Sequence, residues 1–404
     1  MSKGKNKEIF DLGNKYLMPT YSRFPIVFVK AKMQYLWDAE GSKYLDFLGG
    51  YGCLNVGHSN KFVVNELKKQ VGKIIQPSNV YFNQPQVLLA KKLCQITGFG
   101  EKVFFANSGT EAIEAAIKLA RKYSADNFSS SRYEIITFKR AFHGRTMGAL
   151  SATSQPDKQN YFEPLLGGFK YAVFNDIDSV NNLINEKTCA IMIEPVQGES
   201  GVYPADKKFI DSLSDVCKKN DILLIFDEIQ TGFARTGAIF AYQNFNVYPD
   251  ILTVAKSLGG GMPIGAVIST DKISQSFGPG THGSTFGGNA ASCSAGLAVI
   301  DYLMEKKLFE RSKDLGKYFI KKLMSLKKKY KIIKEVRGMG LMIGMEFYKP
   351  VTEDLVSKAL ADKLVINKVS SYTLRFLPTL IITKDNIRIL IKWLDSYIKE
   401  LKDD

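Results

Sequence analysis

Asp227 and Lys256 are the residues of this chain whose types and positions most directly suggest chemistry. Residues 222–226 form an apolar run that is too short for a helix and is bounded by polar residues, which predicts a buried strand that ends at Asp227. A second apolar run, at 249–255, ends at Lys256. Open α/β sheets bind ligands at the carboxyl ends of their strands, so we expect this carboxylate and this amine to face one site.

A carboxylate and an amine at neighbouring strand ends suit pyridoxal phosphate as a cofactor. Its aldehyde forms a Schiff base with a lysine, and its ring nitrogen needs an acid that keeps the pyridinium charged as an electron sink. Taken singly, Asp227 is equally consistent with a turn cap, and Lys256 with a solvated strand end. The other motifs must decide between these interpretations.

A glycine turn follows the predicted strand at 102–106 and leads into an alanine-rich helical segment at 111–123. Backbone N–H groups at such a helix start bind anions, and the helix dipole strengthens the attraction. Ser108, Gly109 and Thr110 occupy this turn, and the last two are candidates to cradle a phosphate. Helix capping explains the same pattern equally well.

Aromatic and charged residues follow the next two predicted strands. Phe142 and Arg145 come after the strand at 133–138, where the ring can stack on a planar group and the guanidinium can bind a carboxylate bidentately. A core phenylalanine and a surface arginine are the plainer interpretations. Glu194 ends another buried strand and Glu199 follows, so these carboxylates are either acid–base groups or ion-pair partners of the arginines.

Two glycine-rich loops, at 49–58 and 281–289, permit unusual backbone angles and close approach. The first is either a connector or one wall of a site. In the second, Thr285 can donate to a phosphate oxygen, although a glycine turn with a helix cap is a fair alternative. Arg375 lies in a predicted strand at 373–377 and is also consistent with a structural role.

The elements that position these residues follow two patterns. From 102 to 255 strands and helices alternate, which predicts a parallel, doubly wound sheet. From about 311 onward, helices alternate with short strands and end in a helix at 384–402, which predicts a smaller α+β unit. Residues 1–20 are predicted to form a helix or an irregular arm.

The composition excludes several classes of protein. The chain has 404 residues, 45% hydrophobic and 24% charged, as expected for a globular protein of two or three domains. We predict neither a membrane helix nor a signal peptide, and five scattered cysteines without a metal or disulfide pattern fit a reducing cytoplasm. The net charge of +15 comes without a nucleic-acid-binding module, so we interpret the lysines as solvated faces that attract anionic substrates.

Several motifs, in this order, resemble those of the fold-type I, class-III aminotransferases, in particular the acetylornithine/ornithine aminotransferase family. The resemblance runs from about Tyr21 to about Ile387 and is closest to the acetylornithine enzymes at 168–176 and 374–382. The motifs are Leu45-Asp-Phe, Asn107-Ser-Gly-Thr-Glu-Ala, Phe142-His-Gly-Arg-Thr, Glu194-Pro-Val-Gln-Gly-Glu, Phe226-Asp-Glu-Ile-Gln-Thr-Gly-Phe-Ala-Arg-Thr-Gly, Ala255-Lys-Ser-Leu-Gly-Gly-Gly and His282-Gly-Ser-Thr-Phe-Gly-Gly-Asn.

The resemblance implies an α/β fold with a large, mostly parallel sheet domain sandwiched by helices and a smaller α+β domain built from both termini. Segment 1–55 would belong to the small domain, 56–310 would form the large cofactor-binding domain, and 311–404 would complete the small domain. Pyridoxal 5'-phosphate is the implied cofactor, without a metal. The implied assembly is a homodimer, with neither nucleic acid nor membrane as a partner.

The resemblance also implies a role for each candidate residue. Lys256 would bond to the cofactor and move a proton, while Asp227 would pair with the ring nitrogen. The implied cofactor contacts are Ser108, Gly109, Thr110, Phe142, Asp227, Glu228, Gln230, Lys256 and, across the dimer interface, Thr285. The implied substrate contacts are Arg145, Glu199, Ser284, Arg375, Tyr21 and Tyr51. Arg145 would bind the α-carboxylate of the amino donor and Arg375 that of 2-oxoglutarate, with Glu199 covering Arg375 while the donor is bound.

These roles predict ping-pong transfer of the δ-amino group of N2-acetylornithine to 2-oxoglutarate. Tyr51 departs from the pattern, because acetylornithine enzymes usually carry an aliphatic residue there and ornithine δ-aminotransferases a tyrosine. Ornithine is therefore the first alternative donor, followed by N2-acetyl-lysine, succinylornithine and 4-aminobutyrate. Ala234, Ser200 and Ala290 replace two glycines and a proline of the family pattern. A non-catalytic protein on this fold would lack Lys256 or Asp227, and both are present.

Overall fold

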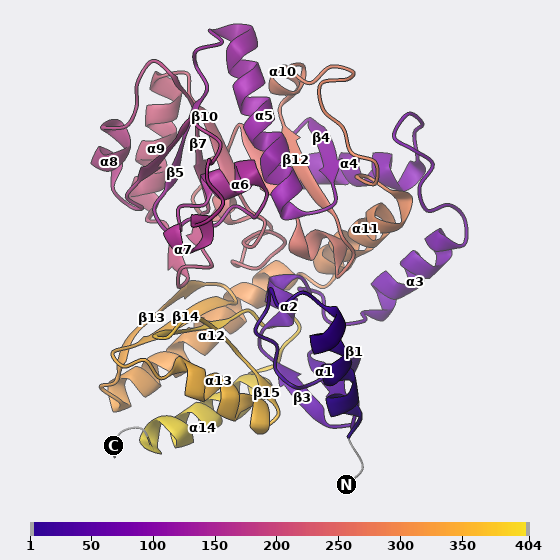
Figure 1. The fold of residues 1–404 in the computed structure, drawn as a ribbon, viewed down its shortest axis with the longest axis vertical. Helices are drawn as coiled ribbons and strands as arrows, with labels where there is room; N and C mark the ends of the chain where they lie inside the picture. Colours follow the sequence, from indigo (N-terminus) through magenta and orange to yellow (C-terminus); the bar gives the residue numbers. More distant parts are fainter. Residues whose placement is uncertain (1–3, 401–404) are drawn as a thin grey trace.

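The computed structural model describes residues 4–400 and consists of two units in contact (Figure 1). The upper unit in this view contains a seven-stranded sheet with the order β4-β12-β11-β10-β7-β5-β6. Its strands are β4 (Lys102–Ala106), β5 (Glu134–Phe138), β6 (Phe169–Ala172), β7 (Thr188–Ile193), β10 (Leu223–Asp227), β11 (Ile251–Val254) and β12 (Gly265–Ser269).

The large sheet is parallel except at one strand. β10 runs parallel to β7 and β11, and β5 runs parallel to β6 and β7. β12 is antiparallel to both of its neighbours, β11 and β4. Only residues 255–264 separate β11 from β12, and a parallel crossover needs about a dozen residues or more, so the chain reverses direction here. The predicted large, mostly parallel sheet is confirmed.

Helices cover both faces of this sheet, because successive residues of a strand point to opposite sides. Leu223 and Ile225 of β10 belong to the apolar core that includes α5 (Gly109–Asn127). Leu224 and Phe226 belong to the second core, which includes α9 (Lys207–Lys219). The other helices of this unit are α3 (Lys61–Val71), α4 (Gln84–Thr97), α6 (Met147–Ala152), α7 (Pro156–Gln159), α8 (Ile177–Asn181), α10 (Asp271–Ser274) and α11 (Ala290–Glu305).

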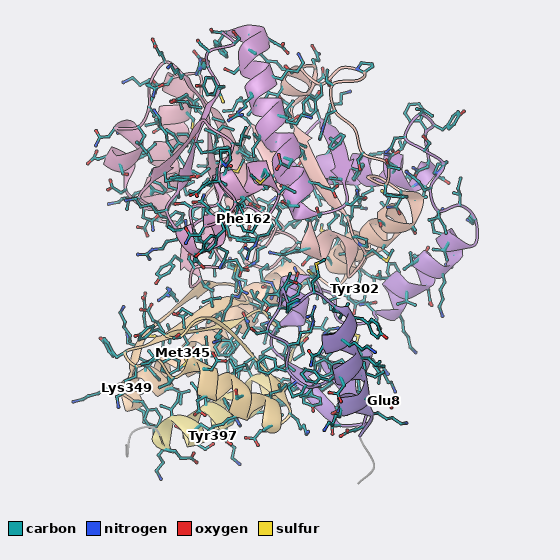
Figure 2. The ribbon with its side chains drawn as sticks, viewed as in Figure 1. Glu8, Phe162, Tyr302, Met345, Lys349 and Tyr397 are labelled. Atoms are coloured by element: carbon teal, nitrogen blue, oxygen red, sulfur yellow. The ribbon has the colours of Figure 1, made fainter. Side chains whose placement is uncertain are left out.

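The lower unit combines the two ends of the chain. One of its sheets joins β1 (Phe28–Lys32), β2 (Tyr35–Asp38) and β3 (Lys43–Asp46) to β15 (Leu364–Val365), which pairs with β3 in parallel. The second sheet contains β13 (Ile333–Met339), β14 (Met342–Phe347), β17 (Thr373–Phe376) and β16 (Asn367–Ser370). The helices are α1 (Lys5–Tyr16), α12 (Leu308–Lys329), α13 (Thr352–Ala361) and α14 (Lys384–Glu400). Figure 2 places Glu8 of α1 and Tyr397 of α14 in this same unit.

The smaller α+β unit built from both termini is therefore confirmed, whereas its predicted residue boundaries stay a prediction. A boundary between 310 and 311 would cut through α12 near its start at Leu308. The final helix was predicted to reach 402, and its residues 401 and 402 lie outside the described part of the chain. Residues 1–3 of the predicted N-terminal helix or irregular arm also lie outside it. The sequence did not predict the short edge strands β6, β15 and β16. Within residues 4–400, no helix is long and apolar enough to cross a membrane.

Candidate active site

A cavity of about 290 Å³ opens at the carboxyl edge of the large sheet. Nine of the predicted site residues line it, namely Ser108, Gly109, Thr110, Phe142, Arg145, Glu199, Asp227, Gln230 and Lys256. His143, Glu194 and Ile229 are among its further lining residues. The structure thus brings together residues that are scattered between positions 108 and 256 in the sequence.

Asp227 is held in one orientation at the end of β10. One carboxylate oxygen, Oδ2, lies 2.7 Å from Nδ1 of His143, and the other accepts a hydrogen bond from the Ile229 N–H at 3.0 Å. Both side chains are buried. Burial opposes a charge on His143, but the hydrogen bond and charge of Asp227 outweigh it and raise the pKa of the imidazole. The pair therefore presents a fixed, charge-supporting acid to the cavity.

Lys256 follows β11 and opens a short 3₁₀ turn, Lys256–Gly259. Its φ of 41° lies in the left-handed region, which is unfavourable for a residue with a side chain and persists only where neighbouring structure enforces it. Ser257 provides one such restraint, because its hydroxyl donates to the Gly52 carbonyl at 2.5 Å. The backbone that carries the amine is consequently fixed against the 49–52 turn.

The start of α5 forms a wall of the cavity. Ser108 is the N-cap of this helix, and its hydroxyl accepts a hydrogen bond from the Glu111 N–H at 3.3 Å. Gly109 has no room for a side chain, since a Cβ there would lie 2.9 Å from Ile229. The Thr110 hydroxyl accepts hydrogen bonds from the Arg145 and Thr146 N–H groups at 3.2 and 3.3 Å. The helix N-terminus and this close approach suit an anion such as a phosphate.

Arg375 and Glu199 form an ion pair behind the cavity. Nη1 of Arg375 lies 2.6 Å from Oε1 of Glu199, and Gln230 donates to the same oxygen at 2.9 Å. Arg375 also donates to Asn367 through Nε and Nη2, so its guanidinium is held on two sides. Burial would raise the pKa of Glu199, but the charges of Arg375 and Lys256 and the hydrogen bonds lower it to about 2. Glu199 is therefore an ion-pair partner, one of the two roles that the sequence left open.

Glu194 has a different environment from Glu199. Its carboxylate accepts hydrogen bonds from the Phe142 N–H at 2.9 Å and the Gly198 N–H at 3.3 Å. Burial raises its pKa to about 7. Glu194 thus fixes the backbone beneath the Phe142 ring. The sequence had offered acid–base chemistry or an arginine partner for it, and the only hydrogen bonds that its carboxylate makes within residues 4–400 are these two backbone bonds.

Several predicted site residues lie outside the cavity. Glu228 is buried and accepts hydrogen bonds from the Ala241 and Tyr242 N–H groups and from the Thr231 hydroxyl, which organises the loop after Asp227. Burial raises its pKa to about 7. Tyr21 is 74% exposed. The contacts predicted for Glu228 with the cofactor and for Tyr21 with the substrate stay predictions.

Ser284 and Thr285 line a separate cavity of about 350 Å³ beside the first turn of α5. The Ser284 hydroxyl lies 3.1 Å from Nδ2 of Asn107. Asn79 donates to the Ser284 and Gly287 carbonyls at 2.8 Å each, so this loop and the segment near 79 form one surface. Within this single chain, the two residues do not line the cavity that contains Lys256.

Tyr51 lies next to the ion pair of Arg375 and Glu199 and does not line the Lys256 cavity. The centre of its ring is 5.6 Å from the guanidinium carbon of Arg375. Its φ of 59° lies in the left-handed region, as do those of Gly49, Gly50 and Gly52. The predicted glycine-rich loop therefore contains a tight turn that carries one aromatic ring, and its role as a wall of the site stays a prediction. Ala234 also has a positive φ of 70°, which explains why glycine suits that position in the family pattern.

His143 is the main residue that the sequence interpretation missed. It was quoted within a motif but given no role, although it directly follows Phe142 after a strand end. Its partner Asp227 is 84 positions away, so no local pattern reveals the contact. The Nε2 atom of His143 is buried without a hydrogen-bond partner within residues 4–400.

The donor set of this cavity fits a phosphorylated, planar cofactor with an aldehyde. Gly109 and Thr110 offer a helix N-terminus without an obstructing side chain, Phe142 offers a ring, Asp227 an anchored acid, and Lys256 an amine. These are the groups that pyridoxal phosphate requires of a protein. Gln230 lies between this set and the Arg375 ion pair, to which it is hydrogen bonded.

Comparison with known proteins agrees with this geometry. The family described as "Aminotransferase class-III" matches residues 16–398. An acetylornithine aminotransferase of Methanocaldococcus jannaschii is 48% identical over 97% of this chain and 98% of its own length. One from Caldanaerobacter subterraneus subsp. tengcongensis is 46% identical over 96% and 98%, respectively. The crystal structure of the ornithine aminotransferase from Toxoplasma gondii ME49 has a TM-score of 0.95 at 30% identity, covering 100% of this chain and 97% of that one.

Proposed function

Because this chain belongs to the class-III aminotransferases, we propose that it transfers the δ-amino group of N2-acetyl-L-ornithine to 2-oxoglutarate. The products are N-acetyl-L-glutamate 5-semialdehyde and L-glutamate. The ion pair between Arg375 and Glu199, 2.6 Å apart beside a cavity that contains Lys256, is the observation that carries this proposal. The acetylornithine aminotransferases that are 46% and 48% identical over nearly the whole chain support the choice of donor.

Pyridoxal phosphate, when bound, supplies an aldehyde that takes up the amino group and a ring that delocalises electrons. Gly109 and Thr110 would hold its phosphate at the start of α5, and Phe142 would pack against its ring. Asp227, which is hydrogen bonded to His143, would pair with the ring nitrogen and keep it protonated. Gln230 would approach the ring hydroxyl.

Lys256 acts as the base that removes a proton from the δ-carbon of the donor and returns it to the cofactor side. A base needs a free electron pair, so the amine acts in its neutral form. The strained turn at Lys256–Gly259 keeps the backbone that carries the amine in one position through both halves of the reaction. Removing water from a cavity of about 290 Å³ strengthens these electrostatic contacts.

The two substrates use the same cavity in turn, which gives ping-pong kinetics. While the donor is bound, Glu199 neutralises Arg375, and Arg145 binds the α-carboxylate of the donor. When 2-oxoglutarate enters, Glu199 moves aside and Arg375 binds the α-carboxylate with two hydrogen bonds. While it is paired with Arg375, Glu199 has a pKa of about 2 and is charged, so displacement of the carboxylate, and not its protonation, frees the arginine.

The active protein is proposed to be a homodimer in which Ser284 and Thr285 reach the cofactor site of the partner subunit. Their position at a separate cavity, and not at the Lys256 cavity of their own chain, supports this assignment. Large apolar side chains on the same surface are exposed in the single chain, including Phe82 at 95% and Phe286 at 61%. Apolar exposure on this scale is characteristic of an interaction surface.

Ornithine is the second candidate donor, because Tyr51 lies beside Arg375 and offers a hydroxyl to a free α-amino group. A single-turnover titration of the cofactor-loaded protein distinguishes the donors. N2-acetylornithine, ornithine, N2-acetyl-lysine and 4-aminobutyrate are added separately without an acceptor, and the visible absorbance is followed. We expect N2-acetylornithine to react fastest. A clear advantage for ornithine would move the assignment to an ornithine aminotransferase, and no reaction with any donor would refute the proposed function.

A further inference from the structure

Glu199 lies in the loop of a short hairpin that contacts both the large and the small unit. The hairpin consists of β8 (Val196–Gln197) and β9 (Tyr203–Pro204), which pair in antiparallel fashion. On the side of the large unit, the Gln197 amide donates to the Lys139 carbonyl at 3.0 Å. The position of Glu199 relative to Arg375 therefore depends on how the other side of this hairpin is held.

Arg337 of β13, in the small unit, holds the other side of the hairpin. Its Nε atom donates to the Gly201 carbonyl at 2.9 Å, and its guanidinium carbon lies 3.8 Å from the centre of the Tyr203 ring. Nη1 lies 2.6 Å from Oε2 of Glu346, to which the Tyr203 hydroxyl also donates at 3.3 Å. We call Arg337, Tyr203 and Glu346 the hairpin clamp. The Arg337 side chain is only 7% exposed, so these contacts are little weakened by solvent.

The packing around the clamp leaves little freedom. Gly201 has a φ of 131°, and a Cβ there would lie 2.8 Å from Nη2 of Arg337. A Cβ at Gly344 of β14 would lie 2.7 Å from the Gly201 carbonyl oxygen. Val202 is buried in a small apolar cluster that also contains Met342. The backbone at Gly201, two residues after Glu199, is thus fixed against β13 and β14 of the small unit.

We propose that Arg337, together with Tyr203 and Glu346, is a positioning residue for substrate discrimination, because it fixes the hairpin at which Glu199 covers Arg375. This inference rests on the proposed function. Glu199 can rotate away from Arg375 for an acceptor only if its backbone stays in place, and it can cover Arg375 for a donor only if its carboxylate reaches Nη1. A loosened hairpin weakens the covered state first, since a hydrogen bond of 2.6 Å tolerates little displacement.

Arg337→Met tests the clamp, because methionine keeps much of the apolar stem and removes every hydrogen bond. In the cofactor-loaded protein, Arg375 is then less well covered. L-Glutamate, which needs a free Arg375 to react as a donor, gains relative to N2-acetylornithine. We expect the single-turnover rate with L-glutamate, divided by that with N2-acetylornithine, to rise about fivefold. This value lies at the low end of measured couplings between sites. Tyr203→Phe removes only the hydroxyl contact to Glu346 and is expected to raise the ratio about twofold.

A binding measurement complements the rates. Glutarate, a five-carbon dicarboxylate without a keto group, is titrated into the cofactor-loaded parent and Arg337→Met proteins by calorimetry. We expect about fivefold tighter binding to the variant, for the same reason. Arg388→Met removes an exposed arginine of the same unit, whose side chain is 62% exposed, and is the matched control. It should change neither the rate ratio nor the affinity.

Two results would overturn the proposal. One is an unchanged ratio and an unchanged glutarate affinity in folded Arg337→Met and Tyr203→Phe proteins. The other is an effect of Arg337→Met that adds fully to that of Glu199→Gln, because residues that act through one another give non-additive effects in a double-mutant cycle. Failure of the parent with every amino donor would instead refute the proposed function, while the glutarate comparison would still test the clamp.

Discussion

The two sides of the candidate active site are held in different ways. Asp227, His143 and Lys256 are fixed by contacts within the large unit and by one turn at 49–52. Arg375 of the small unit is held partly by Asn367 of its own unit and partly by three groups of the large unit, namely Glu199, the Gly198 carbonyl and Gln230. The groups assigned to proton transfer and cofactor binding therefore form a rigid set, whereas those assigned to substrate selection also depend on contacts between the large and the small unit.

The carboxylates of Glu194 and Glu199 on the two sides also differ. Glu194 is buried, its bonds within residues 4–400 come from backbone N–H groups, and burial raises its pKa to about 7. Glu199 is half-buried, and Arg375 and then Lys256 hold its pKa down at about 2. Glu194 therefore titrates near neutral pH, whereas Glu199 is charged as long as it is paired with Arg375.

The largest effect should come from removing the amine of the rigid set. Lys256→Ala is expected to lower the single-turnover rate by about 10⁴-fold or more, since it removes the only group assigned to carry the proton. Visible absorbance on adding N2-acetylornithine measures it. Lys208→Ala, an exposed lysine on α9, is the matched control and should react like the parent. A Lys256→Ala protein that reacts at a rate near the parent's would contradict the assignment.

Asp227→Asn should lower the rate by about 10² to 10³-fold, because an amide supports neither the ring charge nor that of His143. The pKa of His143 should also fall, since burial is then opposed only by the smaller effect of Glu194, and NMR titration of the imidazole measures this shift. Asp250 is a useful control, because its carboxylate accepts from the Leu224 N–H at the opposite end of β10. If Asp250→Asn slows the chemistry as much, the effect is one of stability and not of the site.

Arg375→Lys should affect the two half-reactions unequally. The step with 2-oxoglutarate should slow by roughly tenfold to a hundredfold, because an ammonium cannot make the planar, bidentate contact of a guanidinium. The step with N2-acetylornithine should change by less than about fivefold, since Arg375 is covered in that state. Rapid mixing of each half-reaction separates the two. Equal slowing of both would argue that Arg375 is a structural residue of both states.

Glu194 predicts a pH dependence of stability. Its folded-state pKa of about 7 lies above the ordinary value of 4.5, so the folded state holds a proton that the unfolded state releases between these values. Its contribution is therefore fully present below pH 4.5 and is lost as the pH rises to 7, by roughly 3 kcal/mol. Chemical denaturation at several pH values should show a shallower decline for Glu194→Gln than for the parent. The exposed control Glu186→Gln should leave the slope unchanged.

The smallest effect concerns Tyr51. Tyr51→Phe keeps the ring beside Arg375 and removes the hydroxyl, so the preference for ornithine over N2-acetylornithine should fall by about threefold, the value of one hydrogen bond. Competition between the two donors measures the ratio. Tyr372→Phe, an exposed tyrosine of the small unit, is the control. No change in the ratio would mean that the hydroxyl does not select the donor.

Much of the rigid side could be predicted from the sequence, because its residues follow apolar runs that become parallel strands. Once β7, β10 and β11 are recognised, their carboxyl ends must lie at one edge, and Glu194, Asp227 and Lys256 come with them. β6 was missed because Phe169–Ala172 is a short edge strand, mostly half-buried, whose pattern is weak. β12 was recognised as a strand, but its antiparallel direction follows from the length of a loop and not from its own residues.

The other side could not be derived from local patterns. The contact between Arg375 and Glu199 spans 176 positions and that between Arg337 and Gly201 spans 136, so each depends on how the two units meet. The resemblance to a family supplied the first pair, and only the structure supplied the second. Arg337 carries no distinguishing signal in the sequence, since it is one charged residue in an edge strand.

The parallel pairing of β3 with β15 has a consequence for how the chain is made. The hydroxyl of Tyr44 and the amine of Lys363 meet at 3.2 Å across 319 positions. At a synthesis speed of about 5 to 20 residues per second, the ribosome needs roughly 15 to 60 s between these two residues. Throughout that interval the edge of β3 that later pairs with β15 has no neighbouring strand, and open strand edges promote association between chains. We therefore expect the nascent polypeptide to be more prone to aggregation at this edge than the finished protein.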